Sequence, residues 1–356
     1  MFRYSNVKEI ELALTTHCNA ACPQCPRNIY GGKTIDNLPK VSWDLESFKK
    51  TFTLEVLNHI QRLYFCGTYG EPLACKDLLV ISKYVKQVAP SIRLGVHTNG
   101  GLKGPDLFKK LASCVDFIAF GIDGLADTNH IYRRNVVYSK VIANATAFIQ
   151  AGGHAEWDFI VFRHNQHQVE TARELSKELG FSKFNIKRTS RFFNKAHKLV
   201  NSVPVQNTKG EYEYSIYAPT DLQYYNSNLD RWQELDVKNY LKTTCISCNS
   251  MNHNTLYVDE SGFVFPCGWT SDRLYGYEAE QTLDHKKIKQ MMDNVGLKNT
   301  NVHHNSLENI VNGPWLQMLV ESWTNENRLE RCAVMCGSQI NLLGEQNLDV
   351  SYRIQP

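Results

Sequence analysis

The sequence predicts an α/β fold for the first half of the chain and a small cysteine-bearing region for the second half. In the first half, six short apolar runs between residues 9 and 187 alternate with five segments whose apolar residues recur at helical spacing. Repeated strand–helix units predict a parallel sheet with helices outside it. The periodicity does not distinguish a partial (β/α)6 barrel from a doubly wound sheet.

The predicted elements follow one another with short connections. The strands are expected over residues 9–15, 63–67, 92–97, 116–122, 155–162 and 183–187. The helices are expected over residues 43–62, 76–88, a short segment opened by Pro105, 138–150 and 168–179. Proline is tolerated at the first position of a helix, which agrees with the place of Pro105.

Strand parity predicts which polar groups face the interior of the sheet. In a barrel, alternate residues of a strand face the helices or the interior. On the strand over 155–162, Trp157 and its apolar neighbours would face the helices, so that Glu156 and Asp158 point inward. Asn185 and Lys187 would point inward from the next strand. Such an interior suits a polar ligand, because unpaired buried charge is costly; the alternative is a network of mutual pairs without a chemical role.

Composition excludes several classes of protein. The hydrophobic share of 42% and the charged share of 21% are those of an ordinary globular protein. A net charge of +3 gives no electrostatic footprint for nucleic acid. No apolar run approaches the roughly 18 residues of a membrane span, and the N-terminus lacks the apolar core of a signal peptide. The eleven cysteines are therefore expected to be metal ligands in a reducing cytoplasm rather than disulfide partners.

Three of these cysteines form a C-x3-C-x2-C triplet directly after the first predicted strand. Cys18, Cys22 and Cys25 can hold three irons of a [4Fe–4S] cube and leave the fourth iron open. A ferredoxin closes all four positions and only transfers electrons, whereas an open iron can bind and cleave a ligand. A zinc knuckle, or three unrelated thiols, are the alternatives.

At this triplet the sequence resembles the radical S-adenosylmethionine (radical SAM) superfamily. In that family the open iron chelates the amino and carboxylate groups of SAM, and one electron releases a 5′-deoxyadenosyl radical. The resemblance implies a partial (β/α)6 TIM-like barrel over residues 1–189. It departs from the usual pattern at Gln24, because the residue before the last cysteine is commonly aromatic or large and apolar.

Further motifs follow in the order that the family has them. Gly70 and Glu71, before a proline, resemble the Gly-Gly-Glu-Pro turn that holds the SAM ammonium, with Tyr69 where the first glycine usually lies. The turn Thr98-Asn-Gly after the third strand is interpreted as mainly structural. Asp123 lies in a segment similar to Ser-Ile-Asp-Gly, in which Gly121 replaces the serine.

The resemblance also implies two residues that face the rest of SAM. Arg134 aligns with an arginine that would bind the carboxylate, for which a planar guanidinium is well suited. The adjacent Arg133 is the alternative for this assignment, and Asn135 stands where glycine is usual. Asn165, in the segment after the fifth strand, is expected near the nucleoside.

The strand–helix rhythm is lost over residues 190–244, which are rich in tyrosine and are expected to form a bridge, either a lid or a plain surface connection. A β-hairpin is predicted over 256–266 and a helix over 314–329. With its cysteines, the segment 245–340 resembles the SPASM/twitch extension of radical SAM enzymes, and 341–356 is expected to be a tail. A closed [4Fe–4S] cube takes four thiolates, so the five cysteines of this segment predict one auxiliary cluster. The predicted ligands are Cys248, Cys267, Cys332 and Cys336.

Two alternatives remain for this extension. Cys245 is a spare thiol or replaces Cys248, and four such thiolates could also form a zinc ribbon.

The resemblance thus implies an enzyme, a radical SAM oxidoreductase with two [4Fe–4S] clusters and SAM. The expected reaction is an oxidative modification of a peptide or protein, driven by hydrogen abstraction from carbon. A small polar metabolite such as a sugar or alcohol is the alternative substrate, and a non-catalytic zinc or iron–sulfur scaffold is the alternative of another class. Asp158 and Glu156 are the candidates for a deprotonating base. An external donor such as flavodoxin or ferredoxin would supply the electron, and no nucleic-acid or membrane partner is expected.

Overall fold

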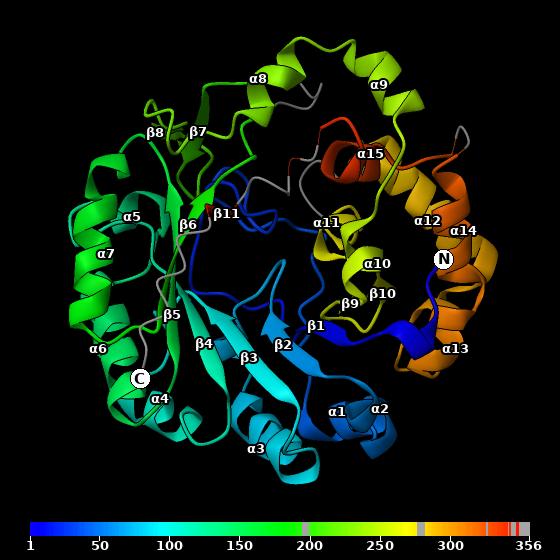
Figure 1. The fold of residues 1–356 in the computed structure, drawn as a ribbon, viewed down its shortest axis with the longest axis horizontal. Helices are drawn as coiled ribbons and strands as arrows, with labels where there is room; N and C mark the ends of the chain where they lie inside the picture. Colours follow the sequence, from blue (N-terminus) through cyan, green and yellow to red (C-terminus); the bar gives the residue numbers. More distant parts are fainter. Residues whose placement is uncertain (194–198, 276–281, 325–326, 341, 343–346, 349–356) are drawn as a thin grey trace. The chain divides into compact units, whose positions relative to one another are not determined.

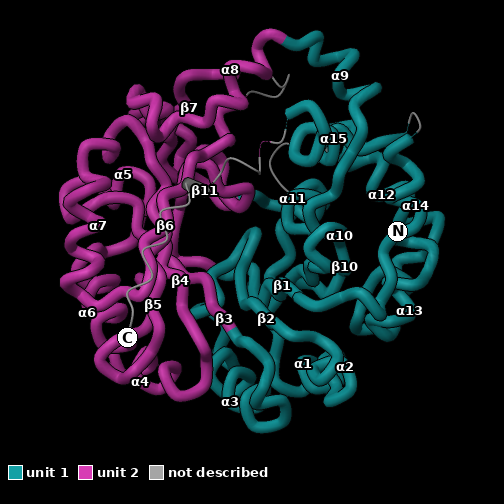
Figure 2. The backbone as a smooth tube through the Cα atoms, viewed as in Figure 1, with its two compact units in different colours: residues 1–17, 35–94, 235–341 teal, residues 18–34, 95–234, 342–356 magenta. Residues whose placement is uncertain are grey.

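The computed structural model describes residues 1–356 except 194–198, 276–281, 325–326, 341, 343–346 and 349–356. The described chain divides into two compact units (Figure 2). Unit 1 consists of residues 1–17, 35–94 and 235–341, and unit 2 of residues 18–34, 95–234 and 342–356. Strand β3 (Arg93–Thr98) crosses the boundary between residues 94 and 95. The predicted domain limits at 189, 244 and 340 stay a prediction.

Unit 1 is built on a short, mostly parallel set of strands (Figure 1). Strand β1 (Glu9–Ala13) pairs in parallel with both β2 (Arg62–Cys66) and β9 (Thr255–Val258). Strand β10 (Val264–Phe265) pairs antiparallel with β9, which confirms the predicted hairpin. The addition of β9 to the edge of β1 could not be read from the sequence, because it joins segments about 245 residues apart.

The helices of unit 1 are mostly short. They are η1 (Tyr4–Asn6), α1 (Leu45–Thr51), α2 (Leu54–His59), η2 (Pro72–Ala74), α3 (Leu78–Val88), α9 (Val237–Thr243), α10 (Asn249–His253), α11 (Gly268–Ser271), α12 (Leu283–Val295), η5 (Leu297–Thr300), α13 (Leu307–Asn312), α14 (Pro314–Ser322) and α15 (Glu330–Cys336). The side chains of Phe48, Phe65 and Trp315 are fully buried in this unit.

Two predicted helices of unit 1 are wrong in extent. The helix expected over 43–62 is interrupted at Phe52, because the side chain of Thr53 accepts a hydrogen bond from the Val56 amide and begins a second helix. The helix expected over 314–329 ends at Ser322, and both closing cysteines lie on the separate helix α15. Residues 325 and 326 of that prediction lie outside the described residues.

Unit 2 contains the parallel strands β4 (Phe117–Gly121), β5 (Ala155–Val161) and β6 (Lys183–Arg188) in sequential order. Residues 95–98 of β3 pair in parallel with β4, and β11 (Asn347–Leu348) pairs antiparallel with β6. Its helices are α4 (Pro105–Leu111), α5 (Asn129–Tyr132), α6 (Tyr138–Gln150), η3 (Gln166–Gln168), α7 (Val169–Glu178) and α8 (Asn228–Gln233). Helices α4, α6 and α7 lie on one side of these strands (Figure 1). The predicted α/β class is confirmed.

Strand β5 confirms the predicted parity. Ala155, Trp157 and Phe159 are completely buried, whereas Glu156 and Asp158 between them are partly exposed. This alternation places the polar residues on the face away from the helices and the bulky apolar residues in the core.

The predicted bridge contains regular structure that the sequence reading missed. Strands β7 (Ser202–Gln206) and β8 (Tyr212–Tyr217) form an antiparallel hairpin of their own. The signal was present, since Val203 and Val205 alternate with Ser202, Pro204 and Gln206 before a turn at Gly210. Residues 194–198 of the bridge, and most of the predicted tail, lie outside the described residues.

Candidate cofactor sites

The cysteine triplet lies on a tight turn of unit 2. The amide of Cys25 donates to the carbonyl of Cys22 at 3.1 Å, and the amide of Ala20 donates to the Cys18 thiol at 3.3 Å. Burial raises the pKa of Cys22 to about 11 and raises that of Cys25, while nearby arginines, Arg133 among them, oppose both shifts. Thiols in this setting ionise when a cation binds them, as a metal cluster would require.

Asn99 is a neighbour of the triplet, and it lies in the turn that the sequence analysis interpreted as mainly structural. Its amide donates to the Cys18 sulfur at 3.8 Å and to the Asn19 side chain at 2.9 Å. Hydrogen bonds to ligating sulfurs tune the potential of an iron–sulfur cluster. Within the described residues, no three His, Cys, Asp or Glu side chains converge closely enough to hold a metal ion as they stand.

A buried ion pair lies beside the triplet. The Arg133 Nε donates to Asp123 Oδ2 at 2.6 Å, and the Ile160 amide donates to Asp123 Oδ1 at 2.6 Å. Burial raises the pKa of Asp123, and Arg133 acts against that shift. A Cβ atom at Gly121 would collide with the guanidinium of Arg133. The space of the serine that the family resemblance leads one to expect at 121 is therefore taken by this arginine.

Arg134, the predicted carboxylate ligand, has one free donor. Its Nη2 pairs with Glu213 on β8 at 2.6 Å, and its guanidinium lies 5.7 Å from the centre of the Tyr214 ring. Its Nη1 is buried and has no hydrogen-bond partner within the described part of the chain. An unpaired buried guanidinium nitrogen is costly, and a bound carboxylate would satisfy it.

Asn165, the predicted nucleoside contact, is fully buried and serves the backbone. Its Nδ2 donates to the carbonyls of Asp123 at 3.0 Å and Ile160 at 2.9 Å, and its Oδ1 accepts from the Phe162 amide at 2.7 Å. Both amide hydrogens are thus committed to the segment after β4 and to the end of β5. The residue positions those segments, and its contact with a nucleoside stays a prediction.

The Gly-Glu-Pro turn of unit 1 is held on both sides. The Glu71 amide donates to the His17 carbonyl at 2.9 Å, and its carboxylate accepts from the Leu73 amide at 3.2 Å. A Cβ atom at Gly70 would collide with the Thr15 carbonyl, so that only glycine fits there. The Glu71 side chain is 3% exposed.

The inward-facing acids of β5 form a network in unit 2. Asp158 Oδ2 lies 3.6 Å from His97 Nε2 and 3.4 Å from Lys187 Nζ. Asp158 Oδ1 accepts a hydrogen bond from the side-chain amide of Asn185 at 2.7 Å. Burial raises the pKa of Asp158, but these three partners outweigh it and hold the pKa well below its usual range. Glu156 accepts from Asn185 at 3.3 Å. Asp158 is therefore ionised at neutral pH and is a weak proton acceptor.

Four cysteines of unit 1 influence one another. Burial and then the neighbouring thiols raise the pKa of Cys332, with Cys248, Cys267 and Cys336 all contributing. Burial raises the pKa of Cys267 to about 12, with smaller effects from Cys248 and Cys336. Cys245 is exposed, whereas Cys248 is buried. Cys248 as the fourth ligand, with Cys245 as the alternative, stays a prediction.

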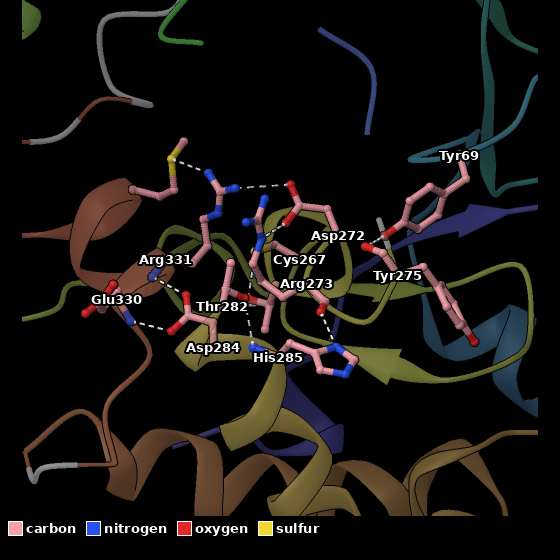
Figure 3. Close-up of polar contacts among 12 residues, drawn as sticks. Tyr69, Cys267, Asp272, Arg273, Tyr275, Thr282, Asp284, His285, Glu330 and Arg331 are labelled. Atoms are coloured by element: carbon pink, nitrogen blue, oxygen red, sulfur yellow. Dashed lines mark hydrogen bonds and ion pairs between the residues drawn. The ribbon is translucent and has the colours of Figure 1, made fainter. Parts of the chain in front are cut away.

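Acidic and basic side chains order the segments that carry these cysteines (Figure 3). Asp284 accepts from the backbone amides of Glu330 at 2.7 Å and Arg331 at 2.8 Å, which fixes the start of α15. Asp272 pairs with Arg273 at 2.5 Å and with Arg331 at 3.6 Å. The sequence reading missed these residues, because nothing in their spacing connects them.

Comparison with protein families decides the nature of the first half. Residues 12–175 match the family model "Radical SAM superfamily". The matched segment is similar to a radical SAM domain. All of the barrel motifs discussed above, from Cys18 to Asn165, lie within the matched residues. No curated protein matches the chain.

Solved structures agree in fold. Streptococcus suis SuiB bound to the precursor peptide SuiA has a TM-score of 0.56 at 13% identity, covering 87% of this chain and 66% of that one. The protein anSMEcpe with bound AdoMet has a TM-score of 0.55 at 17% identity, covering 90% and 81%. Its complex with AdoMet and the Cp18Cys peptide has a TM-score of 0.53 at 17% identity, covering 92% and 88%. The chain thus spans slightly less than two thirds of SuiB.

These likenesses confirm the predicted fold class, a radical SAM partial barrel followed by a β-hairpin and helices. None of the described residues forms a helix long and apolar enough to cross a membrane.

Proposed function

We propose that the protein is a radical SAM oxidoreductase with two [4Fe–4S] clusters that modifies a carbon centre of a peptide or protein. The cysteine triplet, with its arginines and the sulfur-directed Asn99, carries this proposal. When bound there, the cluster would supply the electron that cleaves SAM to methionine and a 5′-deoxyadenosyl radical, which abstracts hydrogen from the substrate.

Each unit contains candidate contacts to SAM, and each set of contacts lies within its own unit. Glu71 and the carbonyls of its turn would accept from the SAM ammonium. The free Nη1 of Arg134 would donate to the SAM carboxylate, while Glu213 holds the other side of the guanidinium. Asp123 would keep Arg133 in place beside Cys22.

The four C-terminal thiols would hold the auxiliary cluster, with Cys248, Cys267, Cys332 and Cys336 as ligands. Their mutual influence on pKa and their burial fit a shared anionic ligand set. None of the eleven cysteines, all of which lie in the described part of the chain, forms a disulfide. An external flavodoxin or ferredoxin would deliver the electrons.

A peptide or protein substrate is supported by the structural neighbours, since SuiB was solved with the peptide SuiA and anSMEcpe with the peptide Cp18Cys. A small polar metabolite is the second candidate, and the network of Asp158, His97 and Lys187 favours it, because these groups could bind hydroxyls or a carboxylate. In either case Glu156 is a better candidate for the deprotonating base than Asp158, whose low pKa makes it a weak proton acceptor.

The experiment measures iron, sulfide and zinc per chain after anaerobic reconstitution, followed by incubation with SAM and dithionite. Wild type is expected to hold about eight irons, and the variant Cys18→Ala/Cys22→Ala/Cys25→Ala about four. Only wild type should form 5′-deoxyadenosine. Cys114→Ala, which alters a buried cysteine of neither group, is the matched control and should behave as wild type. Bound zinc, or iron without SAM cleavage, would leave a scaffold or an electron carrier.

A further inference from the structure

The turn that contains Glu71 is attached to the C-terminal part of unit 1 at two successive residues. The Thr68 amide donates to the Tyr257 hydroxyl at 3.3 Å, and that hydroxyl donates to Thr68 Oγ1 at 2.8 Å. The Tyr69 amide donates to Glu260 Oε1 at 3.1 Å. Tyr257 belongs to β9 and Glu260 to the turn of the β9–β10 hairpin. The hairpin therefore binds the backbone of the turn directly before Gly70 and Glu71.

The Tyr69 side chain makes a further attachment (Figure 3). Its hydroxyl donates to the Tyr275 carbonyl at 2.9 Å, and the two rings meet at a centroid distance of 5.8 Å. Tyr69 is 1% exposed, so the whole ring is packed in the unit. The family turn has glycine at this position, which could make neither the hydroxyl bond nor the ring contact.

The same contacts reach the segment that carries a C-terminal cysteine. Gly268 directly follows Cys267, and a Cβ atom there would lie 3.0 Å from Thr68 Oγ1. Tyr275 follows seven residues later in the same segment. Burial of Glu260 and Tyr257, at 3% and 1% exposure, removes water as a competing partner for these bonds.

We propose that the C-terminal hairpin and the residues after Cys267 hold the turn 68–71 in the conformation that binds the amino group of SAM, with Tyr69, Tyr257 and Glu260 as positioning residues. This inference rests on the proposed function, because it assigns SAM to that turn. The positioning acts on the amino-acid part of SAM and not on its nucleoside.

The test compares Tyr69→Phe with Tyr225→Phe on the reconstituted protein. Tyr69→Phe removes the hydroxyl that binds the Tyr275 carbonyl and keeps the ring. Tyr225→Phe is the matched control, since it also removes one hydrogen-bonded phenol hydroxyl, whose partner Asp230 belongs to neither the turn 68–71 nor the hairpin. Tyr257→Phe is a second variant and removes both bonds to Thr68. Iron per chain is measured for every variant, and only preparations with the wild-type content are compared.

Dissociation constants are measured by equilibrium dialysis for SAM and for 5′-methylthioadenosine, which lacks the amino-acid part. One lost hydrogen bond is expected to weaken SAM binding by roughly three- to tenfold in Tyr69→Phe and by at least as much in Tyr257→Phe. Binding of 5′-methylthioadenosine should change by less than about twofold, and Tyr225→Phe should bind both ligands as wild type does.

The outcomes separate the two levels of the proposal. If wild type binds no SAM, the proposed function fails. If wild type binds SAM and both Tyr69→Phe and Tyr257→Phe bind it equally well, the positioning role is overturned while the proposed function stands. Equal weakening of both ligands would also overturn the inference, because it would indicate general loosening of the unit rather than a displaced ammonium site.

Discussion

The buried pair of Arg133 and Asp123 should respond to substitution in a way that depends on Gly121. Asp123 is 0% exposed and bound by Arg133 at 2.6 Å. Arg133→Ala would leave the carboxylate buried with one backbone donor, and breaking a buried pair in this way costs about 3–5 kcal/mol. Gly121→Ser would force the guanidinium aside, and overpacking of that kind costs about 1–3 kcal/mol.

The double variant Gly121→Ser/Arg133→Ala should lose less stability than the sum of the single changes. The serine fits once the guanidinium is gone, and its hydroxyl can donate to Asp123. Residues in contact commonly show couplings of about 0.5–3 kcal/mol, and we expect at least about 1 kcal/mol of rescue. Since about 1 kcal/mol corresponds to about 2–4 °C in a domain of 150–250 residues, Arg133→Ala should lower the unfolding midpoint by roughly 6–20 °C.

The assay is anaerobic thermal unfolding of reconstituted protein, followed by circular dichroism at one scan rate. Lys177→Ala, which breaks an exposed ion pair with Glu174, is the control and should shift the midpoint little. Strict additivity of the two single variants, or a midpoint shift below about 2 °C for Arg133→Ala, would refute the claim that the arginine occupies the serine's space and compensates the buried acid.

Three further predictions concern pH and the auxiliary site. Burial raises the pKa of Glu260 to about 8. The stability that this group contributes is therefore complete below about pH 4.3 and is lost as the pH rises toward 8. Glu260→Gln should flatten the fall of the unfolding midpoint between pH 5 and 8.5, and an unchanged slope would contradict the raised pKa. The pKa of Asp158 is depressed, so its stabilisation is present above about pH 4 and is lost on acidification below that value; Asp158→Asn should be less stable than wild type at pH 7 and should lose less of its stability below pH 4, as acid titration of circular dichroism would measure. Cys248→Ala should lower the iron content by about four per chain, whereas Cys245→Ala should keep it; the reverse pattern would exchange the two ligands.

The sequence predicted which polar residues share a face of the sheet better than it predicted the partners of those residues. Period-2 alternation on β5 predicted that Glu156 and Asp158 would share one face, because the pleat alone sets that pattern. The partners that depress the pKa of Asp158 come from two other strands, β3 and β6. Parity could place Lys187 on the same face, but it could not place His97 beside them.

Contacts from irregular or distant segments could not be predicted. Arg134 was chosen from a motif, yet its partner Glu213 lies on a hairpin of the tyrosine-rich bridge that the sequence reading left without structure. The edge strand β9 likewise joins β1 across most of the chain. Local periodicity reports which face of an element is buried, and it contains no information about the element that covers that face.

The departures from the family motifs gain a physical meaning once packing is known. At Gly121 a side chain is lost, and Arg133 from outside the motif fills the space and pairs with the motif's own acid. At Tyr69 a side chain is gained, and Tyr275 supplies both a carbonyl for its hydroxyl and a ring that meets the Tyr69 ring in a T-shaped contact. Each departure is thus matched by a partner within the same unit. Changing only one residue of either pair should therefore destabilise the unit, because the other residue then loses its partner.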